Sequence, residues 1–286
     1  MKKLFHVRQS CSRKKALYFL DKKILSFPAI LKKFSSRKRA IKFGVSYSVF
    51  DGEELLEASI ISVRQQVDYV NVVAQLVSWH GNPADDLLVE KLRSLQEKKL
   101  VDEIIFFEPD LKKSPQFNET KKRNIGLKAA VRSGVSYFMT MDCDEFYFEN
   151  EVEEAKKIII NSNITHSYCS QVIYGQMPTQ QVIWNNCCHV QFFSRVDKFS
   201  VLACNEFAPC RVDPTRMILE RAGSKHFVLD VVRMHHFSLV RSNLEQKYAN
   251  TSFRILGEDP IKRPEISERY LANVEDYFNL QSKLKN

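Results

Sequence analysis

The chain has 286 residues, of which 44% are hydrophobic and 27% are charged, and its formal net charge is +9. This length allows a full hydrophobic core in one sizeable α/β domain, with or without an appendage. No apolar stretch reaches the roughly 18 to 20 residues of a membrane-spanning helix, and the N-terminus lacks the apolar core of a secretory signal. We therefore expect a cytoplasmic protein whose seven cysteines are reduced thiols.

The excess positive charge lies at the N-terminus. Residues 1–42 hold 14 Lys and Arg against the single acid Asp21, which leaves 29 basic and 33 acidic residues in the remainder. Apolar residues in this segment step by three or four positions between lysine pairs, which is typical of an amphipathic helix that Pro28 should kink or break. We expect residues 1–41 to bind an anionic membrane surface, so that the protein is peripheral on the cytoplasmic face of the membrane.

Two alternatives stay open for this basic segment. The same pattern suits a helix that packs on the main domain and exposes its lysines to solvent. Nucleic acid is the least favoured partner. Basic charge attracts phosphates, but the aromatic residues of the segment form no recognisable recognition motif.

Strands and helices alternate in the next part of the chain. We expect strands over 41–50, 69–76, 101–108 and 135–141, with helices that open at Asp51 and cover 84–99 and 119–133. The first helix has its expected apolar face on Leu55, Ala58, Ile61 and Ser62, and Gly134 is placed to end the third. Such alternation favours a parallel α/β sheet.

The second half alternates less regularly. We expect a helix over 149–161, strands near 167–174 and 190–193, a loop-rich stretch over 202–214 and a final helix over 265–285. This pattern indicates a mixed arrangement of strands and helices.

Two carboxylates follow the strand that ends at Met141. Asp142 and Asp144 are two positions apart, so their side chains point to the same side of the chain. They also lie at the carboxyl end of a strand, where open α/β sheets bind ligands. Such oxygen ligands suit Mg2+ or Mn2+, completed by water and substrate phosphates. The alternative is a solvated, inert acidic turn, and Cys143 is expected to point the opposite way and pack.

The motifs around this pair resemble a known family. The chain resembles the nucleotide-sugar-binding half of family-2-type glycosyltransferases in three features. These are a first strand with an acidic turn, a helix with Ser62-Val-Arg-Gln-Gln, and Lys121-Lys-Arg-Asn-Ile-Gly126 ahead of Asp-x-Asp. The resemblance covers residues 42–148 and continues more weakly to residue 241. It implies the GT-A fold, a Rossmann-like and mostly parallel central sheet flanked by helices, with a mixed α+β second half on the acceptor side.

The resemblance also implies a division of the chain. Residues 1–41 would form the basic N-terminal segment, 42–148 the nucleotide-sugar-binding half, 149–264 the acceptor and catalytic half, and 265–286 a C-terminal helix.

Several residues of the first half receive roles from this resemblance. Asp144 would ligate the metal directly, and Asp142 would contact the metal, its water or the donor ribose. Arg123 and Asn124, expected at a helix start, would bind the donor nucleotide, because helix N-H groups and a guanidinium suit phosphate. The alternative there is a solvated charge cluster. Phe50 and Asp51 match the place where related proteins hold the nucleobase, although Asp51 is equally suited to cap a helix.

A second group lies late in the chain, in Arg233-Met-His235-His236-Phe-Ser238-Leu-Val-Arg241. Transferases of this fold often take a late histidine as a further metal ligand. Adjacent residues of a strand face opposite ways, so one of His235 and His236 is expected at the metal, with a core histidine as the alternative. Arg241 is expected to contact the donor diphosphate.

Inverting sugar transfer needs one general base that takes the proton of the acceptor hydroxyl. The candidates are Glu206 and Asp213, and related inverting enzymes place the base at about the position of Asp213. However, Asp213 followed by Pro214 is also a good helix cap, here for a helix over 214–220. The sequence lacks a clear Glu-Asp doublet in this region, which leaves the base and the stereochemistry open.

We therefore predict a metal-dependent glycosyltransferase that uses Mg2+ or Mn2+. It would move a sugar from a nucleoside diphosphate sugar to a hydroxyl of a glycan or lipid-linked glycan, in the synthesis of cell-surface polysaccharide. One alternative is a non-catalytic module that binds nucleotide or glycan on the same fold. Another is a metal-dependent phosphoryl or nucleotidyl transferase, which would normally group more carboxylates around two metals.

Overall fold

The computed structural model describes residues 40–174, 181–182, 189–203, 210, 212–241, 247 and 250. Nearly all of the basic N-terminal segment and the whole predicted C-terminal helix lie outside these described residues, as does Glu206. Within the described part of the chain, no helix is both long and apolar enough to cross a membrane.

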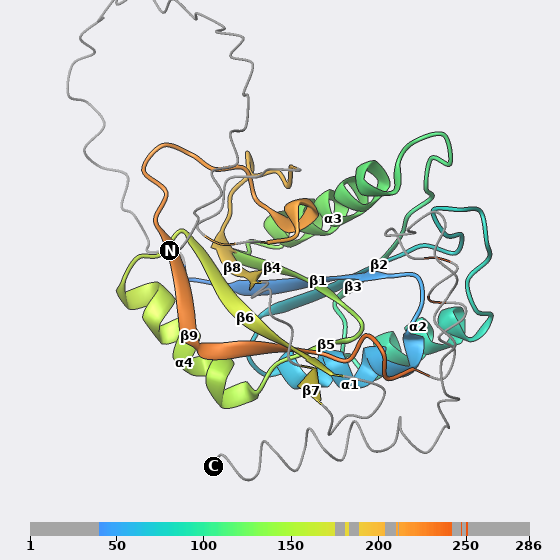
Figure 1. Ribbon diagram of the computed structural model, residues 1–286, viewed down its shortest axis with the longest axis horizontal. Helices are drawn as coiled ribbons and strands as arrows, with labels where there is room; N and C mark the ends of the chain where they lie inside the picture. The colour runs from blue at the N-terminus through green and yellow to red at the C-terminus, as the bar shows by residue number, and fades with distance from the viewer. Residues whose placement is uncertain are drawn as a thin grey trace, which may run out of the picture. The chain divides into compact units, whose positions relative to one another are not determined.

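A mixed β-sheet forms the centre of the described structure (Figure 1). Its strands are β1 (Phe43–Val49), β2 (Tyr69–Ala74), β3 (Glu103–Phe106), β4 (Tyr137–Asp142), β5 (Glu145–Phe146), β6 (His166–Tyr174), β7 (Gln181–Val182), β8 (His189–Arg195) and β9 (His226–His236). They follow the order β3-β2-β1-β4-β8-β6-β9-β5, and β7 pairs with β6. The first four strands are parallel, β8 is antiparallel to both of its neighbours, and β9 is parallel to β6.

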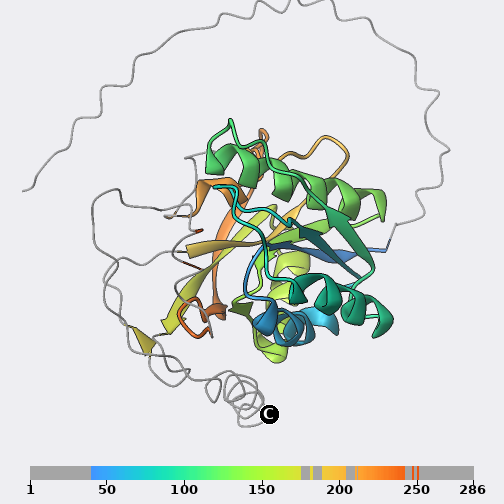
Figure 2. The same cartoon turned by 90° about the vertical axis from the view of Figure 1, so that its right-hand side faces the viewer.

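Helices cover both faces of this sheet (Figure 2). They are α1 (Glu53–Arg64), α2 (Leu87–Glu97), α3 (Pro115–Arg132) and α4 (Glu149–Asn161), followed by the short 3-10 helix η1 (Pro214–Arg216). Helix α3 lies on one face, and α1, α2 and α4 lie on the other. The expected fold class, an α/β sheet flanked by helices with a parallel first half and a mixed second half, is confirmed, and it is the arrangement that the GT-A resemblance implies. The expectation of a mostly parallel sheet holds for β1 to β4, whereas the strands of the second half pair mainly in antiparallel fashion.

The hydrophobic core lies between these layers because the central strands are covered on both faces. Every residue of β2 is buried, and β1 is buried along most of its length. Such continuous burial is typical of parallel strands between two helical layers. Helix α3 approaches β1 closely at Gly126, where an added Cβ would lie 1.8 Å from the Ser46 hydroxyl. The Asn71 side chain donates a hydrogen bond to the Gly126 carbonyl, which fixes α3 over β1 and β2.

Three sequence-based expectations about helices were wrong. Helix α1 buries Leu55, as expected, but its apolar face continues over Leu56 and Ile60, whereas Ile61, which we expected on that face, is 54% exposed. Helix α3 begins at Pro115, earlier than expected, because Ser114 caps it and proline suits the first helical position. The helix expected over 214–220 is only the three-residue η1. The predicted end of α3 at Gly134 is confirmed, since this residue has φ +85°.

Candidate functional site

The candidate site lies at the carboxyl edge of the sheet, where β1, β4 and β9 come together. Asp142, the last residue of β4, is in register with Ser48 of β1. Glu145 of β5 pairs with His236 at the end of β9. The turn that carries both aspartates is thus held between the first and the last long strands. Around this turn lies a set of side chains that we call the charge cluster, made of the acids Asp51, Asp142, Asp144 and Glu145 and the bases Arg123, Arg216, Arg241 and Lys247.

Asp142 is bound by two arginines from different elements. Arg123 of α3 donates from Nη2 to Oδ1 at 3.0 Å, and Arg216 of η1 donates from Nη2 to Oδ2 at 2.6 Å. Burial opposes ionisation of this carboxyl group, but the two guanidinium groups hold its pKa below the usual value. Its side chain nevertheless remains 31% exposed. Asp142 is therefore an ionised acceptor that a ligand can still reach.

Asp144 is buried and is bound by cations on one oxygen. Its Oδ2 accepts hydrogen bonds from Arg241 Nη2 and, at 2.9 Å, from Lys247 Nζ. Its Oδ1 lies 3.5 Å from His236 Nε2. Burial alone would raise the pKa of Asp144, but Lys247 and Arg241 hold it well below the usual value. This carboxylate is fully ionised and charge-compensated by the protein.

The turn between β1 and α1 holds Arg241 in place. Nη1 of this arginine lies 3.0 Å from Asp51 Oδ1, so the guanidinium connects Asp51 with Asp144. Gly52 has φ +75°, and a Cβ at this position would lie 2.7 Å from Arg241 Nη1 and 2.6 Å from Cys143 Sγ. Glycine is thus required both for the backbone conformation and for the close approach. Cys143 is buried and donates to the Asp51 carbonyl, as its predicted packing role implies.

Arg216 is one of two cationic residues of the charge cluster that the sequence did not predict, the other being Lys247. It donates to both carboxylate oxygens of Glu145, at 2.9 and 2.6 Å, as well as to Asp142. Its Nε lies 3.4 Å from Asp213 Oδ2. Bidentate pairing of this kind fixes a guanidinium in orientation as well as in position. Arg216 therefore connects the predicted general base Asp213 with Asp142 and Glu145. Nothing in the local sequence distinguishes it from a surface arginine.

The structure separates the two late histidines. His235 is buried, and its Nδ1 lies 2.8 Å from the Tyr174 hydroxyl, with its ring edge-on to Phe148. His236 faces the opposite way, toward Asp144. His235 is thus a core histidine, because successive residues of a strand face opposite sides of the sheet. Of the two histidines, only His236 faces the candidate site.

The other predicted donor contacts are placed as follows. Arg123 and Asn124 lie inside α3 rather than at its start, so the expected free N-H groups are not beside them. The Asn124 amide is paired with both backbone groups of Leu202, which gives it a structural role. Phe50 and Asp51 follow β1 and are partly exposed at the carboxyl edge, where the resemblance expects the nucleobase.

Asp213 caps η1, which is the role that the sequence offered as an alternative to the general base. Its Oδ1 accepts hydrogen bonds from the Thr215 N-H at 2.9 Å and from the Thr215 hydroxyl at 2.8 Å. Its side chain is partly exposed, and Oδ2 faces Arg216. The capping role does not remove Asp213 from the candidate site, since Arg216 links it to Asp142.

Lys122 adds a further buried base next to the charge cluster. Its Nζ donates to the Val49 carbonyl at 2.7 Å and lies 5.6 Å from the centre of the Trp79 ring. Burial lowers the pKa of Lys122 to about 7, although Asp142 favours the charged form. The group therefore stabilises the end of β1, at the point where the chain turns toward Asp51.

The described side chains do not fit the divalent ion that the sequence predicts. No three His, Cys, Asp or Glu side chains in the described part of the chain are grouped closely enough to hold a metal ion. Arg123 and Arg216 already bind the Asp142 oxygens, and His235 points into the core. The pair left facing each other is Asp144 and His236, and the other oxygen of Asp144 carries two cations. The described part of the chain therefore offers no preformed site for a divalent ion.

No protein-family model and no curated protein matches the chain. Solved structures match it over part of its length. Staphylococcus aureus TarS 1–349 in complex with UDP-GlcNAc is 15% identical, with a TM-score of 0.34, over 51% of this chain and 38% of that one. GalNAc-T7 with UDP, GalNAc and Mn2+ is 10% identical, with a TM-score of 0.42, over 69% and 44%. Mannose-1-phosphate geranyltransferase from Thermus thermophilus is 11% identical, with a TM-score of 0.30, over 48% and 43%. The chain spans less than half the length of each of these three structures.

Proposed function

We propose that the protein is a glycosyltransferase that moves a sugar from a nucleoside diphosphate sugar to a hydroxyl group of a glycan or lipid-linked glycan. The observation that carries this proposal is the charge cluster at the carboxyl edge of β1 and β4. Open α/β sheets bind nucleotides at this edge. Arginine and lysine bind phosphate oxygens, and ionised carboxylates accept hydrogen bonds from ribose hydroxyls.

Within this proposal, the parts of the site receive different roles. Phe50 and Asp51, after β1, contact the nucleobase. Asp142 accepts from a ribose hydroxyl, which its partial exposure permits. Arg241, next to Asp144, faces the diphosphate. Positive groups fixed at this place stabilise the charge that develops on the diphosphate as it leaves.

The general base of the transfer is proposed to be Asp213. The acceptor oxygen attacks the anomeric carbon while its proton passes to Oδ2 of Asp213, and the bond to the diphosphate breaks with its electron pair on the leaving oxygen. A single displacement of this kind inverts the anomeric configuration. The link from Asp213 through Arg216 to Asp142 supports this role, because it places an acid beside the proposed donor site.

We further propose that residues 1–41 bring the enzyme to an anionic membrane surface that carries a lipid-linked acceptor. The support is the charge of this segment, with 14 Lys and Arg in residues 1–42. Flotation with phosphatidylserine liposomes checks it on the full-length protein and on a 43–286 variant. Stronger flotation of the full-length protein is the expected result, and equal flotation of both proteins contradicts the membrane role.

The catalytic proposal is tested with a panel of UDP-, GDP-, CDP- and dTDP-sugars, by thermal shift and by hydrolysis of the donor. One nucleoside diphosphate sugar is expected to stabilise the protein and to be hydrolysed slowly. Replacement of Asp142 by Asn should weaken binding of this donor at least about tenfold. The matched control is Asp230→Asn, at an exposed position of β9. If no donor of the panel stabilises the wild-type protein, the proposal is wrong.

A further inference from the structure

We propose that the protein holds the donor diphosphate without a divalent metal ion, and that Lys247 and Arg241 together supply the positive charge in its place. This inference rests on the proposed function and specifies which charges its donor site uses. It departs from the metal role that the Asp-x-Asp pattern led us to expect.

Asp144 already has its negative charge compensated by neighbouring groups of the protein. In this turn, Asp144 is the carboxylate expected to ligate the metal directly, yet it is buried against three nitrogen donors. Arg241 and Lys247 bind Oδ2, and His236 faces Oδ1. Two of these groups are permanent or near-permanent cations at neutral pH. The negative charge that would attract a divalent ion is therefore already compensated.

A metal ion added to this arrangement would be repelled by the two cations next to Asp144. A divalent ion on Oδ1 of Asp144 would lie within a few ångströms of both Arg241 and Lys247. Positive charges that close to each other in a partly buried place repel strongly. Arg241 also has no room to withdraw, because it is packed against Gly52 and paired with Asp51.

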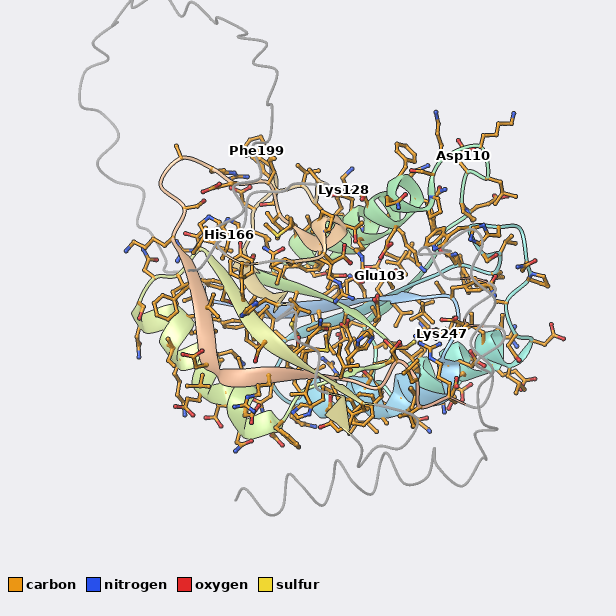
Figure 3. The ribbon with its side chains drawn as sticks, in the orientation of Figure 1. Glu103, Asp110, Lys128, His166, Phe199 and Lys247 are labelled. Carbon is orange, nitrogen blue, oxygen red and sulfur yellow. The ribbon has the colours of Figure 1, made fainter. Side chains whose placement is uncertain are left out.

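The two cations next to Asp144 differ in how firmly the protein holds them. Arg241 is fixed between Asp51 and Asp144, whereas the hydrogen bond of Lys247 goes to Asp144 and its side chain is 19% exposed. Figure 3 shows Lys247 on the side of the sheet where β1 and β2 end. Lysine is a flexible point charge with three donors. Lys247 can thus keep one hydrogen bond to Asp144 and direct another N-H to a phosphate oxygen.

In the transfer itself, Lys247 faces the leaving group. The bond between the anomeric carbon and the diphosphate breaks with its electrons on oxygen, the acceptor oxygen forms the new bond, and the acceptor proton passes to the base. The leaving diphosphate gains one negative charge, and a fixed ammonium next to it stabilises this charge without an added ion.

The test uses the full-length protein, with UDP, GDP, CDP and dTDP as probes in isothermal titration calorimetry. For the nucleotide that binds, the Kd is expected to change less than about twofold between a buffer with EDTA and one with MnCl2. Hydrolysis of the matching donor is expected to persist in EDTA. Binding and hydrolysis that disappear in EDTA and return with Mn2+ or Mg2+ would overturn the inference and leave the proposed function intact. If no nucleoside diphosphate binds in either buffer, both fail.

Lys247 is tested by substitution, with the matching monophosphate as an internal control. In EDTA, Lys247→Met should weaken binding of the diphosphate at least about tenfold and change binding of the monophosphate less than about twofold. Lys247→Arg, which keeps the charge, should retain most of the affinity for the diphosphate. Lys225→Met, at an exposed position before β9, is the matched control. Equal weakening of both nucleotides, or no weakening of either, would contradict the role of Lys247.

Discussion

Two arginines of one short segment lie toward opposite ends of the sheet and differ in almost every physical respect. Arg216, in the charge cluster, is buried and pairs with the buried Glu145 and with Asp142. Arg221 pairs with Asp197 just beyond the end of β8, and its side chain is 50% exposed. Both are arginine-carboxylate pairs, but only the pair of Arg216 with Glu145 is buried away from water. The number of ion pairs therefore says little about how much they contribute to the free energy of unfolding, which depends on their burial.

The same contrast extends to the polar groups around the two arginines. At the candidate site, four acids and four bases come together from the ends of β1 and β4, from β5, α3 and η1, and from the chain after β9. Toward the other end of the sheet, where Figure 3 shows His166, the buried polar network of the described residues contains no arginine-carboxylate pair, and its one carboxylate contact is between His226 and the exposed Glu220. His166 lies 3.1 Å from the Ser194 hydroxyl and stacks on His226, which contacts Tyr168. A charged side chain that is paired within the protein can exchange its partner for a charged group of a ligand. A network without such pairs mainly stabilises the fold.

The largest expected effect comes from removing the buried arginine. Arg216→Met leaves the carboxylates of Glu145 and Asp142 without their shared cation in a buried place. We expect the free energy of unfolding at neutral pH to fall by about 3 to 5 kcal/mol. Urea denaturation followed by circular dichroism measures it. If the free energy of unfolding falls no more than it does in Arg221→Met, the burial of Arg216 contributes nothing to stability.

An intermediate effect is expected from the neutral end of the sheet. Burial and the neighbouring His226 lower the pKa of His166 to about 4. The unfolded state, with a pKa near 6.5, therefore takes up a proton that the folded state excludes, and stability falls as the pH drops from about 6.5 to 4. His166→Asn should remove a part of this acid destabilisation on the order of 2 kcal/mol. Urea denaturation at several pH values checks this, with the exposed His80→Asn as control; an unchanged pH dependence in His166→Asn would contradict it.

The smallest effect is expected from the exposed pair. Arg221→Met removes the ion pair with Asp197, but both partners remain solvated. We expect a loss of at most about 1 kcal/mol, and less at high salt. Paired urea titrations at low and high NaCl would measure it. A loss as large as that of Arg216→Met, or one that grows with salt, would remove the distinction between the two ends.

Local sequence patterns were sufficient to predict the framework of the first half. The alternation of strands and helices and the placement of Asp142 at a strand end depend on periodicity and neighbouring residues, and the structure has both. The helix over 149–161 was also predicted with the bounds of α4. The start of α3 was missed because Ser114 and Pro115 lie outside the apolar pattern from which the helix was inferred.

The chemical state of the candidate site could not be predicted in the same way. Arg216 and Lys247 reach the aspartates from elements far along the chain, and no local pattern reveals such a contact. The Asp-x-Asp motif indicates where two carboxylates lie, but their partners decide whether they are available to a metal ion. His236, by contrast, follows from strand alternation once the direction of β9 is known.

The position of Arg216 late in the chain also affects how the protein folds during its synthesis. Glu145 precedes Arg216 by 71 residues, so the ribosome delivers the buried carboxylate well before its cation. Until then, burial of ionised Glu145 is costly, and the turn between β4 and β5 must stay hydrated or keep a proton on this group. The first βα units are therefore expected to form early from local contacts. The turn that carries both aspartates is expected to close only after the second half has emerged.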